Sequence, residues 1–212
     1  MALELDDRDL PEILELPLTT GEPWWYWLGG RPSLDLVNTL RERWRRQVET
    51  LVTADDLGRW LVRAHLLPVP RRVARGVLGE ARELREAIDV AVQATVAGDP
   101  PPPAAIDHID SWLMYAGSRP ALALGPDGLP LLSERPAADS PRRALGMVAL
   151  DAAEMLGSAE QRARIRICAS DTCSARFYDR SPAGRRRWCS MRTCGNEAKA
   201  RRHRARAREG VA

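Results

Sequence analysis

The sequence predicts an α+β protein: a predominantly helical N-terminal domain with short strands and a hairpin, followed by a small cysteine-rich unit. Three observations support this fold class. Apolar residues recur at helical spacing through most of the N-terminal part. A Gly-Pro-Asp-Gly sequence at positions 125–128 separates two short apolar runs, as in a hairpin. All four cysteines of the 212-residue chain lie between positions 168 and 194. We therefore predict two domains, residues 1–160 and 161–212.

The first predicted elements are an aromatic strand and a helix. Residues 24–27 read Trp-Trp-Tyr-Trp and precede two glycines, which is typical of a strand that ends in a turn. Ser33 is a candidate N-cap for the helix that follows. Its apolar stripe consists of Val37, Leu40, Trp44, Val48 and Leu51.

Four more elements complete the predicted N-terminal domain. Thr53 and Asp56 form a variant of the capping box, so a second helix begins there. Helical spacing then predicts a long helix over residues 71–96 and another over residues 104–116, separated by four prolines. The hairpin follows, and Ser140 with Pro141 marks the start of a last helix that ends near Gly157.

The four cysteines form two Cys-x4-Cys pairs separated by fifteen residues, Cys168 with Cys173 and Cys189 with Cys194. Four thiolates from two short loops can close the tetrahedron that a structural zinc ion requires. Two disulfides, an iron–sulfur cluster or four unrelated thiols are the alternatives. Because no targeting segment points to an oxidising compartment, we expect reduced thiols and one structural zinc ion.

The residues around the cysteines predict a treble-clef-like zinc finger. Residues 164–168 alternate Arg and Ile, which indicates a short strand. Residues 176–179 and 186–189 can pair as a hairpin across the turn at 181–184. Good helix formers fill residues 197–208, so the last ligand lies at the start of a helix. A unit of this size has little core, and zinc binding, worth about 10–16 kcal/mol in finger peptides, must hold it folded.

The net charge of +3 hides an asymmetry along the chain. Residues 162–212 contain 15 basic and 4 acidic residues, a net charge of +11, whereas the preceding residues carry a net charge of −8. A basic tail on an acidic body suggests contact with nucleic acid, although a merely solvated basic face is the alternative. The candidate phosphate contacts are Arg185, Arg186, Arg187, Arg192, Lys199, Arg201, Arg202, Arg204, Arg206 and Arg208.

The motif that contains the second cysteine pair also resembles a known family. Residues 186–199 read Arg-Arg-Trp-Cys-Ser-Met-x-x-Cys-Gly-Asn-x-x-Lys, and a Phe-x-Asp sequence begins at Phe177. Together with the upstream pair, this run resembles the CGNR zinc finger. That finger usually follows an ABATE domain, and residues 34–39 resemble the opening motif of that domain. The resemblance implies a stress-responsive bacterial transcription regulator. One position departs from the signature, because Glu197 stands where the family has Arg.

We therefore expect a transcription regulator whose finger binds DNA and whose N-terminal domain senses a small molecule or a partner. RNA binding and a non-enzymatic protein-interaction module are the alternatives. The residues that we consider for an effector pocket are Trp24, Trp27, Asp35, Asn38 and Thr39, which can instead pack the core and satisfy backbone groups at a helix start.

Other function classes have no support in the sequence. There is no Gly-rich phosphate loop and no convincing nucleophile–base pair, so we do not expect an enzyme. No apolar run approaches the roughly 20 residues that cross a bilayer, and the N-terminus is acidic rather than basic. We expect a cytoplasmic protein without a membrane partner, and the sequence indicates no oligomeric state.

Overall fold

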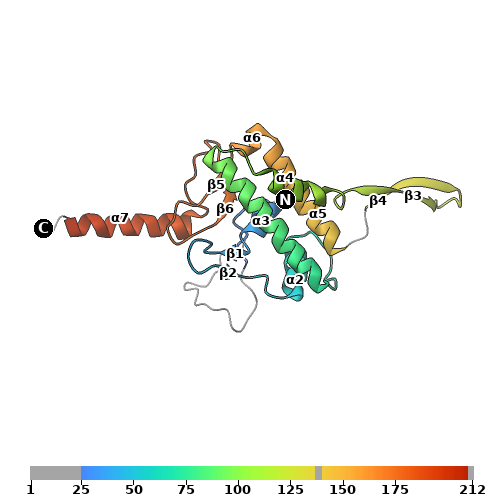
Figure 1. Cartoon of the computed structure of the whole chain (residues 1–212), viewed down its shortest axis with the longest axis horizontal. Coiled ribbons are helices and arrows are strands. Elements are labelled where there is room, and N and C mark those ends of the chain that lie inside the picture. Colours follow the sequence, from blue (N-terminus) through green and yellow to red (C-terminus); the bar gives the residue numbers. More distant parts are fainter. Residues whose placement is uncertain (1–24, 137–139, 210–212) are drawn as a thin grey trace.

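The computed structural model describes residues 25–136 and 140–209. In this part of the chain a helical bundle holds most of the buried apolar side chains, and it consists of α1 (Pro32–Val37), α2 (Ala54–Arg63), α3 (Arg75–Ala97), α4 (Pro103–Leu113) and α5 (Pro141–Gly157). Helix α3 packs against α4 and α5, and the short α1 contacts both α3 and α5 (Figure 1). Leu34, Trp60 and Ile88 are fully buried at the centre. Each such side chain contributes about 1.5–3 kcal/mol, so the bundle is the main source of stability.

The capping signals that the sequence shows at Thr53 and Ser140 are confirmed. The Thr53 hydroxyl accepts the Asp56 N–H (3.1 Å) and the Asp56 carboxylate accepts the Thr53 N–H (2.7 Å), which is the predicted capping box of α2. Ser140 caps α5 through the N–H of Arg143 (3.2 Å), and Pro141 occupies its first turn. Both helices therefore begin where their local sequence directs.

The predicted helix from Ser33 to Leu51 is wrong. Helix α1 ends at Val37, and the chain continues as an antiparallel ribbon of β1 (Leu40–Arg41) and β2 (Val48–Glu49). Between these strands the backbone φ angles of Glu42 and Gln47 are 47° and 51°, in the left-handed region, which breaks a right-handed helix.

The start of α1 and the aromatic segment before it also differ from expectation. Arg31 rather than Ser33 is the N-cap, and the Ser33 N–H donates instead to the Asp151 carboxylate of α5 (3.0 Å). Residues 25–28 form no strand. Trp24 lies outside the described residues. The aromatic side chains of this segment pack against other rings instead of forming part of a sheet. Trp27 stacks on Trp60 at a ring-centroid distance of 5.8 Å.

The predicted hairpin is confirmed and is longer than expected. Strand β3 (Ser118–Leu124) pairs antiparallel with β4 (Pro130–Pro136), and the register places Leu122 opposite Leu132. This ribbon extends away from the bundle (Figure 1). Leu122 and Leu132 are therefore at least 70% exposed.

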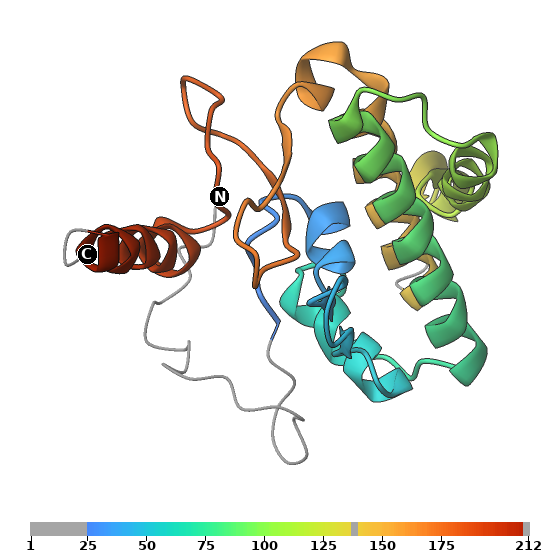
Figure 2. The ribbon, with the colours of Figure 1, turned by 60° about the vertical axis from the view of Figure 1, so that its left-hand side comes forward.

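The cysteine-rich unit joins the bundle through two short strands. After the short helix α6 (Ala159–Arg162), the unit consists of β5 (Ile165–Ile167), β6 (Arg176–Tyr178), the π-helical turn η2 (Met191–Gly195) and α7 (Asn196–Glu209). Strand β5 packs on α3 and β6 packs on α1, whereas α7 projects away from the bundle (Figure 2). The cysteine-rich unit is therefore packed against the bundle through β5 and β6, whereas α7 extends away from it.

The predicted hairpin between residues 176–179 and 186–189 is wrong. Strand β6 pairs antiparallel with β5 instead, with Ile165 opposite Tyr178. The other side of β6 is also occupied, because the Arg176 N–H donates to the Asn38 side chain (2.8 Å) and the Tyr178 N–H donates to the Gly29 carbonyl (2.8 Å). No edge of β6 is left for residues 186–189.

Candidate metal centre and basic helix

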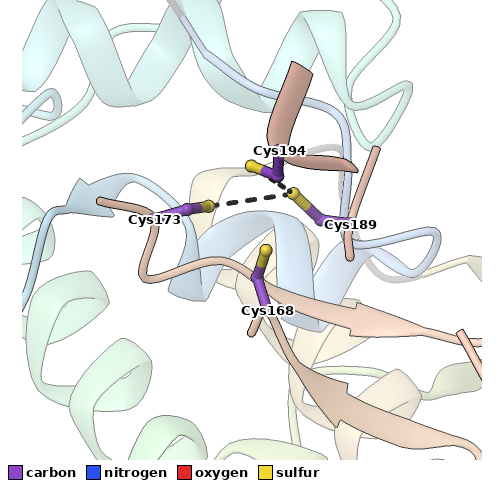
Figure 3. A group of neighbouring side chains, drawn as sticks. All are labelled: Cys168, Cys173, Cys189 and Cys194. Carbon is purple, nitrogen blue, oxygen red and sulfur yellow. Dashed lines mark hydrogen bonds between the residues drawn. The ribbon is translucent and has the colours of Figure 1, made fainter. Parts of the chain in front are cut away.

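The four cysteines converge on one point (Figure 3). Their sulfur atoms all lie within 4.8 Å of one another. The Cys189 sulfur is 3.7 Å from that of Cys173 and 3.8 Å from that of Cys194. All four cysteines are free thiols in the structure, which therefore does not support the two-disulfide alternative.

Local hydrogen bonds fix the two loops that carry these sulfurs. In the first loop the Cys168 N–H donates to the Ala175 carbonyl (2.9 Å). In the second, the Gly195 N–H donates to the Ser190 carbonyl (3.0 Å) and helps to close the turn η2 that carries Cys194. The last cysteine lies two residues before α7 begins at Asn196, so the position of that helix depends on the metal centre.

The donor set fits a soft cation with tetrahedral coordination. Hydrogen bonds with Cys173, and then with Cys189 and Cys194, lower the pKa of Cys168, whereas those with Cys168 and Cys173 raise the pKa of Cys189. Four sulfurs this close cannot all carry negative charge unless a cation compensates it. Zinc takes four cysteine thiolates at a closed structural site, and these residues meet that requirement.

Strand β6, which lies between the two cysteine pairs, is anchored to the bundle at a place that we call the docking seam, formed by Asn38, Asp89 and Arg176. The Asn38 amide group accepts the Arg176 N–H (2.8 Å) and donates to the Arg176 carbonyl (2.9 Å). The Arg176 guanidinium donates to both Asp89 carboxylate oxygens, at 2.6 and 3.2 Å. Both side chains of this ion pair are at most 4% exposed.

The docking seam was missed by the sequence analysis, although one signal was present. Asp89 lies on the buried face of α3 with Ile88 and Val92, where a carboxylate needs a partner. Arg43 from the loop after β1 is a second partner, at 3.1 Å from the Asp89 carboxylate. The sequence did not reveal that the main partner would come from 87 residues further along the chain.

Among the described residues considered for an effector pocket, Asp35 and Thr39 satisfy backbone groups at or near α1. The Asp35 carboxylate accepts the Gly29 N–H (2.8 Å), and the Thr39 hydroxyl donates to the Leu36 carbonyl (2.6 Å). Burial raises the pKa of Asp35 to about 7, against the effect of that Gly29 hydrogen bond. Of the set, Asn38 borders a cavity of about 200 Å³ beside the metal centre.

The candidate phosphate contacts fall into two groups. Arg186 points inward and donates to the Cys189 carbonyl (2.6 Å), while Arg201 pairs with Asp171 (2.7 Å) and Glu197 (3.2 Å). A second group is exposed and consists of Arg185, Arg187, Arg192, Lys199, Arg204 and Arg206. The side chains of Arg202 and Arg208 lie outside the described residues.

Two family models match the chain. The ABATE model, described as "Putative stress-induced transcription regulator", matches residues 30–159. The CGNR zinc finger model matches residues 164–207, which include all four cysteines. No curated protein sequence matches the chain. In the described part of the chain, no helix is long and apolar enough to cross a membrane.

Proposed function

The chain belongs to the ABATE family and carries a CGNR zinc finger. We propose that it is a transcription regulator that binds DNA through its basic C-terminal helix α7. One observation carries the proposal. A structural zinc site fixes the start of α7, and the helix then leaves the body of the protein (Figure 1). A helix presented in this way can reach a groove of duplex DNA without a clash from the bundle.

The charges on α7 support contact with phosphate groups. Lys199, Arg204 and Arg206 are exposed, and the remaining exposed arginines lie close to the metal centre in sequence. Arginine binds phosphate through charge-assisted, often bidentate hydrogen bonds. We therefore assign Arg204 and Arg206 the main phosphate contacts among the described side chains, and we leave base recognition unassigned.

Glu197 replaces the basic signature residue with an acidic one that has local partners. Its carboxylate accepts the Thr172 hydroxyl (3.3 Å) and pairs with Arg201 (3.2 Å). It also lies in the first turn of α7, where negative charge favours the helix dipole. We propose that Glu197 stabilises the start of α7 at the cost of one phosphate contact.

We further propose a structural rather than a catalytic role for the metal. Four cysteine ligands fill the coordination shell of zinc and leave no position for a substrate or an activated water. The function is therefore non-enzymatic in this proposal. The N-terminal domain would act on α7 through the docking seam, which is the physical link by which an effector or partner could change the finger.

A direct binding experiment tests this proposal. The zinc-loaded full chain is titrated with duplex DNA, folded RNA and an acidic polypeptide at several salt concentrations. We expect tightest binding to DNA, with a log–log salt slope of about −0.9 for each phosphate neutralised. Preference for RNA would replace the DNA assignment. Binding to the polypeptide alone would favour a protein-interaction module.

A further inference from the structure

We propose that the metal centre is also a redox-sensitive modification site, in which small hydroperoxides oxidise Cys173 and Cys189 to a disulfide. The cavity of about 200 Å³ beside the centre supports this inference. Cys173, Cys189 and Cys194 border the cavity, whereas Cys168 does not. A volume of this size exceeds that of several water molecules, so hydrogen peroxide fits within it.

The cysteines differ in accessibility. Cys173 is partly exposed, whereas Cys168, Cys189 and Cys194 are at most 8% exposed. The Cys173 sulfur is therefore the one that a solute in the cavity meets first. The Cys189 sulfur also borders the cavity and lies 3.7 Å from the Cys173 sulfur (Figure 3). This distance must shorten to about 2.05 Å when a disulfide forms.

The chemistry balances with the peroxide as the sole oxidant. The Cys173 thiolate attacks one peroxide oxygen, the O–O bond breaks, and hydroxide leaves while Cys173 becomes a sulfenic acid. The Cys189 thiolate then attacks that sulfur, the S–O bond breaks, and a second hydroxide leaves. Two thiolates lose two electrons in total, the peroxide gains them, and solvent protons convert both hydroxides to water.

Arg41 on the cavity wall is suited to assist the first step. Its side chain is buried, one guanidinium nitrogen donates to the Tyr26 hydroxyl (2.8 Å), and the guanidinium lies 4.1 Å from the Tyr26 ring centroid. The other terminal nitrogen, Nη1, has no hydrogen-bond partner among the described residues. An unpartnered N–H on the cavity wall can donate a hydrogen bond to the bound peroxide and stabilise the departing hydroxide.

Disulfide formation would remove two of the four zinc ligands. Cys168 and Cys194 alone do not close a tetrahedral site, so zinc would be released. Because Cys194 lies in the turn η2 that leads into α7, release of zinc would free the start of that helix. The expected loss of DNA binding rests on the proposed function, whereas the oxidation and the zinc release do not.

The test uses the zinc-loaded full chain, hydrogen peroxide and a chromophoric zinc chelator, followed by peptide mapping after alkylation of free thiols. We expect one zinc released per disulfide and a single cross-link, between Cys173 and Cys189. Thr193→Phe narrows the cavity from its exposed rim and should slow both events several-fold. Met191→Phe is the matched control, because Met191 is 59% exposed on the same turn and does not border the cavity.

Each outcome decides the proposal. A different cross-link, over-oxidised monomeric cysteines, or equal rates for the two variants would overturn it. If a variant fails to load zinc, the peptide map of the unmodified chain still decides the identity of the disulfide. A protein that forms the disulfide and releases zinc but never binds nucleic acid would contradict the proposed function alone.

Discussion

Arginines occupy both the docking seam and α7, but their surroundings are opposite. Arg176 is 2% exposed and both of its terminal groups are tied to neighbouring residues, including the Asp89 carboxylate. Arg204 and Arg206 on α7 are exposed on a helix that projects from the body. The same residue type therefore serves internal structure in one region and is available for a partner in the other.

The comparison shows why counting basic residues overestimates a binding surface. Residues 162–212 carry a net charge of +11. Part of that charge is neutralised within the protein, as with Arg176 at the docking seam and Arg201, which pairs with Asp171 and Glu197. Buried pairs are screened little by salt, whereas exposed charges are screened strongly. Salt dependence is therefore the property that separates the two regions.

The largest effect is expected from removing the metal, because the cysteine-rich unit contains both Arg176 of the docking seam and α7. Chelation of zinc, or Cys194→Ser, should unfold η2 and release α7, because zinc binding supplies about 10–16 kcal/mol in small finger units. The bundle should stay folded but lose stability, since Ile165 of β5 belongs to its core. Hydrogen exchange resolved along the chain measures this, and full protection of α7 without metal would contradict it.

The next effect concerns the docking seam. Asp89→Leu leaves the Arg176 guanidinium buried beside Arg43 without its main carboxylate partner, and should cost about 3–5 kcal/mol of unfolding free energy. Urea unfolding at low and high salt measures the loss, which should change little with salt. The double variant Asp89→Leu with Arg176→Met is the control and should recover much of the stability, because it removes the uncompensated buried charge.

A smaller effect is expected on α7, where the bundle should remain unaffected. Replacing Arg204 and Arg206 together by Ala should flatten the log–log salt slope of DNA binding by about 1.8 units. Arg201→Ala is the matched control on the same helix. It should change the slope by less than one phosphate contact, because Asp171 and Glu197 already neutralise Arg201. Equal effects from Arg201 and Arg204 would mean that the intramolecular pairs do not persist in the complex.

The smallest effect tests the one acidic residue in the family signature. Glu197→Arg places a positive charge in the first turn of α7 and should cost a few tenths of a kcal/mol of stability. It should also tighten DNA binding and steepen the salt slope by about one unit. Glu197→Gln removes the negative charge without adding a positive one, so it separates these two contributions to DNA affinity. Unchanged affinity in both variants would place the start of α7 away from the nucleic acid.

Much of the fold and the metal centre follows from short sequence patterns. The two Cys-x4-Cys pairs, the Thr53–Asp56 capping box, the Ser140-Pro141 helix start and the Gly-Pro-Asp-Gly turn each act over a few residues. Their geometry depends on the local backbone, so distant parts of the chain do not change the result. The stripe from Val37 to Leu51 misled because helical spacing alone does not exclude the left-handed backbone at Glu42 and Gln47.

The sequence by itself determined which residues meet at the metal centre, where most helices begin, and that the C-terminal part is basic. Only the tertiary structure decided which arginines are buried and which strand β6 accepts as its partner. Asn38, Gly29 and Asp89 occupy or anchor β6 from positions far away in the chain. Pairings of this kind depend on how the helices pack and leave no periodic signal in the residues that make them.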